Sequence, residues 1–203
     1  MNTRATALTI TFTALTVALN PNFTHLAIPA PYAPFLIYQI WEIPIVAAFL
    51  LSGPKVGASI AALNALVLLT LFPGALLMGP FYNLAATLSM LLGIYVANRL
   101  TSVSLGDGNA VYASVKYTAK TTAAATALGI VFRAGIMTII NYVALRFPPP
   151  VGYYLSEPAV VAYLPLIGLF NATLALYTVP LGLFLARIVA ARVKLQNFAS
   201  LSA

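Results

Sequence analysis

Charged residues are scarce in this sequence. They make up 6% of its 203 residues, and only three are acidic: Glu42, Asp107 and Glu157. A soluble domain carries about 25% charged residues, so a soluble fold of this length would lack the charge that covers a hydrated surface. The shortage excludes an ordinary soluble domain and indicates a chain whose surface mostly faces hydrocarbon.

Cysteine is absent, and histidine occurs once, as His25. The first absence excludes disulfide bonds and thiolate metal sites, and a single histidine excludes a multi-histidine metal centre. The sequence contains neither H-E-x-x-H nor G-x-S-x-G, and it lacks the ATP-binding pattern G-x-x-x-x-G-K-[ST]. We therefore expect no catalytic site, no metal site, no resident cofactor and no means of powering transport with ATP.

Long apolar runs are what the sequence has instead, since 62% of its residues are hydrophobic. The runs lack the alternation of barrel strands, and a backbone in hydrocarbon must satisfy its own hydrogen bonds, which leaves helices. We predict an all-α, polytopic membrane protein, a six-helix bundle that forms one integral membrane domain over residues 1–203. The predicted helices cover residues 5–19, 39–51, 56–72, 81–98, 112–145 and 159–193. Pro165 or Pro180 is expected to break or kink the last of them, and the polar tail from Lys194 is expected to fray.

The basic residues predict the orientation in the membrane. With the N-terminus in the cytoplasm and six crossings, Arg146 alone lies in an outer loop and eight other basic residues lie on the inner side. These eight are Arg4, Lys55, Arg99, Lys116, Lys120, Arg187, Arg192 and Lys194. We expect both termini in the cytoplasm, the chain in the cell membrane, and the loops 20–38, 73–80 and 146–158, rich in proline and aromatic residues, outside. Because the basic residues are too scattered to form a patch, the net charge of +7 does not indicate a nucleic-acid partner.

Two charged residues fall inside predicted helices, where charge is costly. Glu42 lies early in the second helix, and Arg133 lies near the middle of the fifth. The two either pair with one another, which would neutralise both, or contact a ligand. Asn141 lies eight residues after Arg133, so both side chains fall on roughly one helical face.

Side-chain amides are the other polar groups expected within the membrane. Asn171 lies inside the sixth predicted helix, and Asn83 opens the fourth. Each amide offers two donors and two acceptor sites, so several inward-facing amides would suit a planar heterocyclic ligand. The alternative is that these amides join helices to one another by hydrogen bonds. Tyr38, at the end of the first outer loop, is an aromatic side chain that would stack on such a ligand.

Several short motifs resemble the S components of energy-coupling factor (ECF) vitamin transporters, which are the substrate-binding subunits of those importers. Trp41–Pro44 resembles an acidic-Ile-Pro element of that family, and Ser52–Gly57 resembles the Gly-Pro-x-x-Gly that joins its second and third helices. Arg133–Tyr142 resembles the fifth helix of the riboflavin-specific members, and the run from Leu164 to Asn171 is similar to their sixth. The motifs occur in the family's order and on the expected helices.

This resemblance implies a site that opens outward beneath the first outer loop and captures riboflavin from outside the cell. It also implies partners, namely a membrane coupling subunit and two cytoplasmic ATPase subunits that drive uptake. Ala14 and Ala18 are a small-xxx-small pair on the first helix and match the family's contact with the coupling subunit. Asn141 and Asn171 match the positions of its ligand-contacting amides.

Two alternatives to riboflavin uptake are open. The riboflavin-specific members usually carry a lysine shortly after the sixth-helix asparagine, where this chain has Ala172, Thr173 and Leu174, so an S component for a different vitamin or small heterocycle is one alternative. A self-contained secondary transporter is the other. Ion-coupled carriers usually need several intramembrane carboxylates or a broken-helix repeat, and this chain offers Glu42 alone within its predicted helices.

Overall fold

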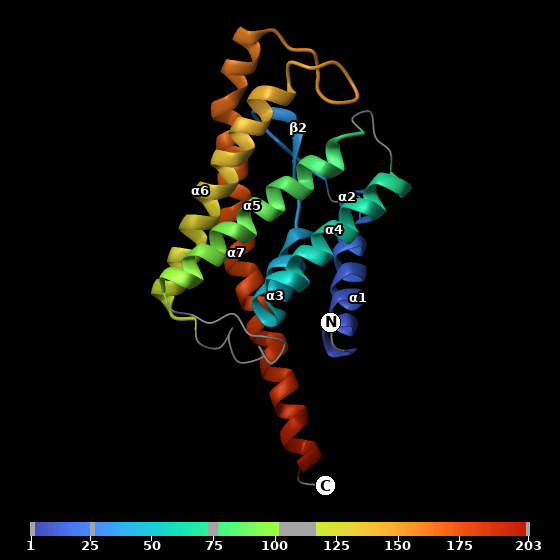
Figure 1. Cartoon of the computed structure of the whole chain (residues 1–203), viewed down its shortest axis with the longest axis vertical. Coiled ribbons are helices and arrows are strands. Elements are labelled where there is room, and N and C mark those ends of the chain that lie inside the picture. The colour runs from blue at the N-terminus through green and yellow to red at the C-terminus, as the bar shows by residue number, and fades with distance from the viewer. Residues whose placement is uncertain (1–2, 25–26, 73–76, 102–116, 202–203) are drawn as a thin grey trace.

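The computed structural model describes residues 3–24, 27–72, 77–101 and 117–201. Within them lie α1 (Thr3–Ala18), a short α2 (Pro21–Thr24), strands β1 (Ile28–Ala30) and β2 (Ala33–Tyr38), α3 (Glu42–Ser52), α4 (Pro54–Leu71), α5 (Gly79–Leu100), α6 (Ala119–Ala144) and α7 (Glu157–Leu201). Each of the six predicted helices overlaps a helix of the structure (Figure 1). The predictions that concern His25, Asp107, Lys116, the break at 73–76 and the start of the fifth helix at 112 lie outside the described residues.

Among the described residues, four helices are long and apolar enough to cross a membrane: Pro54–Leu71, Gly79–Leu100, Ala119–Ala144 and the part of α7 from Glu157 to Arg192. Two shorter apolar helices, Ala5–Ala18 and Glu42–Ser52, accompany them. A span of the hydrocarbon core takes roughly 17–25 residues of helix, so the four long helices alone meet that length. The chain is therefore a multi-pass helical membrane protein.

A sharp turn separates α3 from α4. Gly53 has φ 89° and ψ 177°, a conformation that residues with a side chain rarely adopt. Pro54 then opens α4, where its missing N–H has no partner to lose. The Gly53–Pro54 pair therefore reverses the chain within one residue, and α3 packs back along α4.

The core is centred on α3. This helix packs against α1, α4 and α7, and nine of its eleven residues are buried (Figure 1). Its apolar side chains, among them Ile45, Phe49 and Leu50, belong to the largest cluster of buried residues. Because α3 is covered from three sides, its first residue, Glu42, is held in the interior of the bundle.

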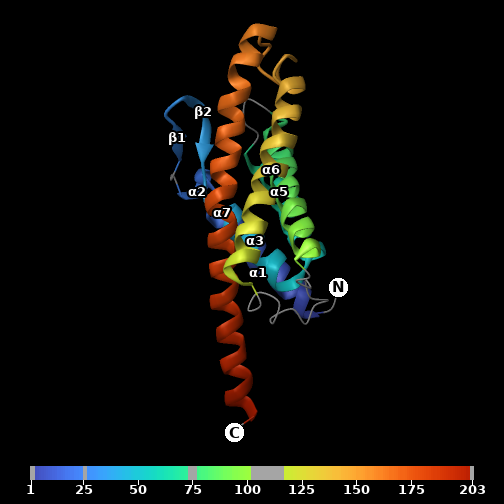
Figure 2. The same ribbon diagram turned by 90° about the vertical axis from the view of Figure 1, so that its left-hand side faces the viewer.

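Helices α5, α6 and α7 form a second group, in which α6 packs on both neighbours. At the crossing of α5 and α6, a Cβ atom on Gly93 would come within 2.3 Å of the carbonyl oxygen of Leu128, so only glycine permits this approach. Figure 2 shows the β1–β2 hairpin on one side of α7 and helices α5 and α6 on the other. Since the hairpin lies near one end of the bundle, that end is called the hairpin end below, and the end where α5 finishes and α6 begins is called the opposite end.

Three details of the sequence prediction are wrong. The segment 20–38 is not a plain loop, because it contains α2 and an antiparallel hairpin that pairs Ile28 with Tyr38. The fifth predicted helix is too long at its start, since Thr118 is an extended N-cap whose hydroxyl accepts from the N–H of Thr121. Helix α7 runs unbroken through Pro165 and Pro180 and on to Leu201. Its packing against α6 and α3 supports one continuous helix across both prolines.

Candidate functional site

A buried ion pair lies at the centre of the bundle. Arg133 of α6 donates from Nη2 to Oε1 of Glu42 at 2.9 Å, and its Nη1 donates to Oε2 of the same carboxylate. The two side chains are 2% and 0% exposed. The pair that the sequence suggested therefore forms, with the two-point geometry that strengthens an arginine–carboxylate contact.

Asn171 of α7 completes this cluster. Its Oδ1 accepts from Nε of Arg133 at 3.1 Å, and its Nδ2 donates to the carbonyl of Ile167 at 2.9 Å. The Sδ of Met90, on α5, lies 3.8 Å from Nη1 of Arg133. Every guanidinium nitrogen of Arg133 is thus engaged, and the cluster joins α3, α5, α6 and α7 at one point.

The hairpin is attached to α7 by a chain of hydroxyl groups. The hydroxyls of Tyr32 and Tyr38 lie 2.7 Å apart, and the Tyr38 hydroxyl lies 2.9 Å from Oγ1 of Thr173. The ring of Tyr38 also packs on Phe170 with a centroid separation of 5.0 Å. Burial, followed by the hydrogen bond with Tyr38, raises the pKa of Tyr32 to about 12, so its hydroxyl keeps its proton at neutral pH.

A second contact anchors the chain just after the hairpin. The hydroxyl of Tyr177 donates to the carbonyl of Gln39 at 2.6 Å. Thr173 and Tyr177 are four residues apart, so both side chains lie on one face of α7. Through these two contacts, α7 fixes the position of the hairpin and of the residues just before α3. Asn171 lies on the same helix, two residues before Thr173.

Asn83 and Asn141 lie apart from the ion pair, nearer the hairpin end. Asn141 is eight residues beyond Arg133, roughly 12 Å along the helix at 1.5 Å per residue, and its Nδ2 donates to the carbonyl of Met137 at 2.7 Å. Asn83 precedes Thr87 and Met90 on the buried face of α5 that reaches Arg133. Both amides are half-buried, whereas Asn171 is fully enclosed, so the structure does not gather the three amides into one cluster.

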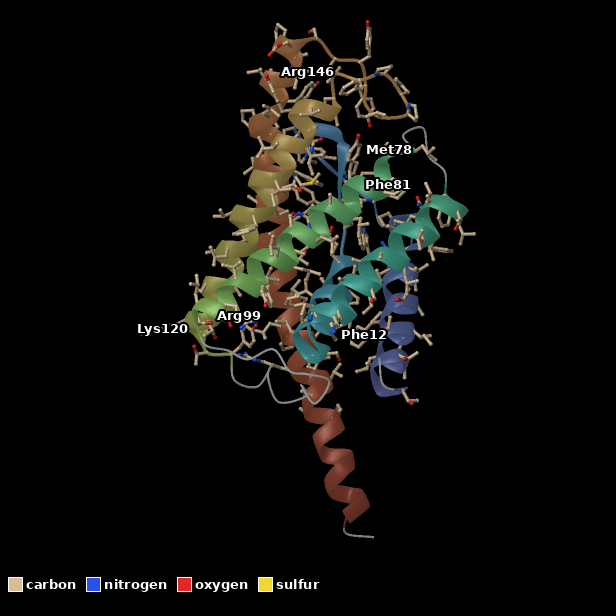
Figure 3. All side chains as sticks on the ribbon, viewed as in Figure 1. Phe12, Met78, Phe81, Arg99, Lys120 and Arg146 are labelled. Carbon is tan, nitrogen blue, oxygen red and sulfur yellow. The ribbon has the colours of Figure 1, made fainter. Side chains whose placement is uncertain are left out.

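Several polar contacts hold the hairpin end of the bundle where α5, α6 and α7 meet it. Arg146 stacks on the Tyr142 ring at 3.9 Å and donates to Oε1 of Glu157 at 2.9 Å. The N–H of Met78 donates to the carbonyl of Pro150 at 3.3 Å. Figure 3 shows Arg146 and Met78 at this end of the bundle. The start of α5 is therefore tied to the connection between α6 and α7.

Ala14 and Ala18 lie on the outside of the bundle. Both are exposed on α1, and they line an apolar groove of about 610 Å³ between α1 and α4. The remaining residues of the groove are Ile10, Thr13, Val17, Phe23, Leu63 and Val67. The groove leaves the small residues open to contact from another apolar helix.

No family model matches this sequence, and no curated protein matches it either. A structural similarity does exist. The structure described as the S component of a bacterial ECF transporter matches over 96% of each chain, with a TM-score of 0.54 and 19% sequence identity. The fold resembles that of an ECF S component. At this level of identity the similarity concerns the fold, and it extends over nearly the whole of both chains.

Sequence reasoning identified the ion pair but missed the hydroxyl chain. Tyr32, Thr173 and Tyr177 carried no motif, and Thr173 stood out only as part of the run that replaces a lysine. The useful signal was the presence of two tyrosines, Tyr32 and Tyr38, in one proline-rich segment. A buried tyrosine hydroxyl needs a partner, so a polar side chain on a neighbouring helix was to be expected.

Proposed function

We propose that this chain is the S component of an ECF-type importer that captures riboflavin outside the cell. In this proposal the chain crosses the cell membrane six times, with both termini in the cytoplasm, and the hairpin end faces outward. The observation that carries the proposal is the fold similarity to an S component over 96% of both chains. Two features support a ligand site at that end: the attachment of an aromatic hairpin to α7 and the half-buried amides of Asn83 and Asn141.

The proposed ligand contacts fall into two groups. Asn83 and Asn141 keep hydrogen-bonding capacity for the ring nitrogens and carbonyls of a planar heterocycle, since the bond from Asn141 to the carbonyl of Met137 uses a single N–H. Tyr38, on the hairpin, offers an aromatic ring at the same end of the bundle. Glu42, Arg133 and Asn171 form the second group. They lie deeper in the bundle and support the site indirectly, by fixing the relative positions of α3, α6 and α7.

The proposed partners are a membrane coupling subunit and two cytoplasmic ATPase subunits. The groove along Ala14 and Ala18 is apolar and open, as a surface must be if another membrane helix is to pack on it. No part of the sequence binds ATP by the usual phosphate-binding loop. Energy for uptake would therefore come from the ATPase partners.

Riboflavin binding tests the proposal directly. The purified protein should quench riboflavin fluorescence on titration, with submicromolar affinity and without any partner. Asn141→Ala should weaken binding by about tenfold, as expected when a ligand group loses a hydrogen bond worth roughly 1.5 kcal/mol. Asn22→Ala, which removes an exposed amide from α2, should leave the affinity unchanged.

Folded protein that binds no riboflavin at micromolar concentration would overturn the riboflavin assignment. Binding of another water-soluble vitamin in the same assay would then support an S component with a different substrate. A self-contained secondary transporter is less well supported, because Glu42, the acidic residue buried in the described part of the chain, is committed to Arg133. Uptake by vesicles that contain this chain alone, driven by a proton or ion gradient, would reverse that conclusion.

A further inference from the structure

A hydrogen-bonded network joins three helices at the opposite end of the bundle. Arg187 of α7 donates to the carbonyl oxygen of Tyr117, which immediately precedes α6 and its N-cap. The hydroxyl of Tyr117 in turn donates to Oδ1 of Asn98 on α5. The ends of α5, α6 and α7 are therefore fastened together through Tyr117.

Three cations surround this network. Arg99 follows Asn98, Lys120 lies three residues after Tyr117, and Arg187 contacts Tyr117 directly. All three side chains are exposed. Figure 3 shows Arg99 and Lys120 at this end of the bundle, where α5 finishes and α6 begins.

No carboxylate in the described part of the chain neutralises these cations. Glu42 is buried against Arg133, and Glu157 pairs with Arg146 at the hairpin end. The third acidic residue of the sequence, Asp107, lies outside the described residues. Arg99 and Arg187 contact oxygen atoms of tyrosine instead, which carry no full charge.

The side chain of Arg99 is held in one orientation. Its Nε and Nη2 donate to the hydroxyl of Tyr95 at 3.0 and 2.7 Å, and the guanidinium lies 5.2 Å from the centre of the same ring. This leaves Nη1 available to an anion. Next to it, Asn98 is only 2% exposed, and its Nδ2 has no hydrogen-bond partner. This N–H group is enclosed by the helices, so the charge of Arg99, and not a hydrogen bond from Asn98, is what the site offers an anion at the surface.

The surroundings of the cations are apolar. Leu100, next to Arg99, is 74% exposed, and Leu92, two turns earlier on α5, is also exposed. In a membrane these side chains face lipid tails at the depth where helix α5 ends. A ligand with an anionic head and apolar tails matches both halves of this surface, whereas a small soluble anion matches only the cations.

We propose that Arg99, Lys120 and Arg187 form a binding site for the phosphate of an acidic phospholipid. The phosphate would accept from the guanidinium of Arg99 and be attracted by the other two cations, as arginine and lysine recognise phosphate elsewhere. The acyl chains would lie along the exposed leucines of α5. This site is independent of the transported ligand, because it lies at the end of the bundle remote from the hairpin.

The test compares lipids and variants in one assay. Purified full-length protein is titrated with phosphatidylglycerol or phosphatidylcholine in detergent, and lipid bound per protein is counted by native mass spectrometry. We expect phosphatidylglycerol to be retained preferentially. Each basic residue near a lipid headgroup contributes about 1 kcal/mol, equivalent to roughly fivefold in affinity. Arg99→Gln with Lys120→Gln should therefore weaken phosphatidylglycerol binding by about 25-fold.

Two further measurements make the result specific. Lys55→Gln with Arg192→Gln removes the same amount of exposed positive charge and should change the affinity less than twofold. Arg99→Lys with Lys120→Arg keeps the charge and should retain most of the binding, which separates loss of the site from loss of folding. An equal loss in the Lys55/Arg192 control would show general surface electrostatics and overturn the proposal. Displacement of the lipid by millimolar inorganic phosphate would overturn it in favour of a soluble-anion site.

Discussion

The two ends of the bundle handle positive charge in different ways. From the centre of the bundle to the hairpin end, both described arginines pair with a carboxylate: Arg133 with Glu42 and Arg146 with Glu157. At the opposite end Arg99 and Arg187 donate hydrogen bonds to tyrosine oxygens and pair with no carboxylate of the described residues. Two of the three acidic residues of the sequence pair with Arg133 and Arg146, and no described acidic residue pairs with Arg99 or Arg187.

This difference shows where positive charge is paired within the chain and where it stays available to groups outside the chain. A charge in the membrane interior must be paired within the chain, because no solvent is there to meet it. A charge at the membrane surface can be met by lipid headgroups and water. The paired end is thus internally fixed, and the unpaired end is suited to bind something outside the chain.

The largest expected effect comes from breaking the buried pair. Arg133→Met leaves the carboxylate of Glu42 buried and unpaired, and removal of one partner from such a pair costs about 3–5 kcal/mol. We expect Arg133→Met and Glu42→Gln each to lower the thermal unfolding temperature strongly in detergent.

The double variant Glu42→Gln with Arg133→Met serves as the control. Because it leaves no unpaired charge, it should be more stable than Arg133→Met alone, so the two effects should not add. Additive losses in this double-mutant cycle would contradict a direct interaction between the two side chains.

A smaller effect is expected from the hairpin attachment. Tyr38→Phe keeps the ring on Phe170 but removes the hydroxyl that joins Tyr32 to Thr173. A net loss of about 1 kcal/mol is typical for such a hydrogen bond, and it should appear as faster proteolysis within the hairpin rather than as global unfolding. Tyr154→Phe, which removes an exposed hydroxyl at the rim, should leave proteolysis unchanged. Equal protection of Tyr38→Phe and the unmodified protein would show that the hydroxyl chain does not hold the hairpin.

The helices could be predicted from the sequence because long apolar runs indicate contact with hydrocarbon. The pairing of Glu42 with Arg133 could be suggested for a similar reason, since a lone buried charge requires a partner and few candidates existed. The hairpin was not predicted, because Pro29, Pro31 and Pro34 favour extended turns and do not reveal which segments pair.

The hydroxyl chain could not be predicted because it depends on tertiary register. Tyr38 and Thr173 are 135 residues apart, and the sequence around neither residue predicts their contact. Asn171 shows the same limit in another form. Its presence on the sixth predicted helix was clear, but its engagement with Arg133 and Ile167 follows only from how α6 and α7 align.

The ion pair at the rim should matter less than the buried one. Arg146 and Glu157 are both accessible to solvent, and exposed pairs contribute about 0.2–1 kcal/mol. Glu157→Gln should therefore lower the unfolding temperature only slightly, and 1 M salt should reduce the difference further because it screens exposed charges. The buried pair should respond little to salt. A strong salt dependence of the Arg133–Glu42 coupling would contradict the contrast between interior and surface.

The titration of Tyr32 should have the smallest effect on the hairpin at physiological pH, because it takes place only at alkaline pH. Its pKa is raised from 10.0 to about 12 by burial and by the hydrogen bond with Tyr38, so the folded state favours the neutral phenol. The stabilisation is fully present below pH 10 and is lost as the pH rises from 10 toward 12. Attachment of the hairpin, followed by its rate of proteolysis, should therefore be constant between pH 6 and 9 and weaken only above pH 10. Tyr32→Phe should remove this alkaline step, and a step that persists in that variant would have to come from another group.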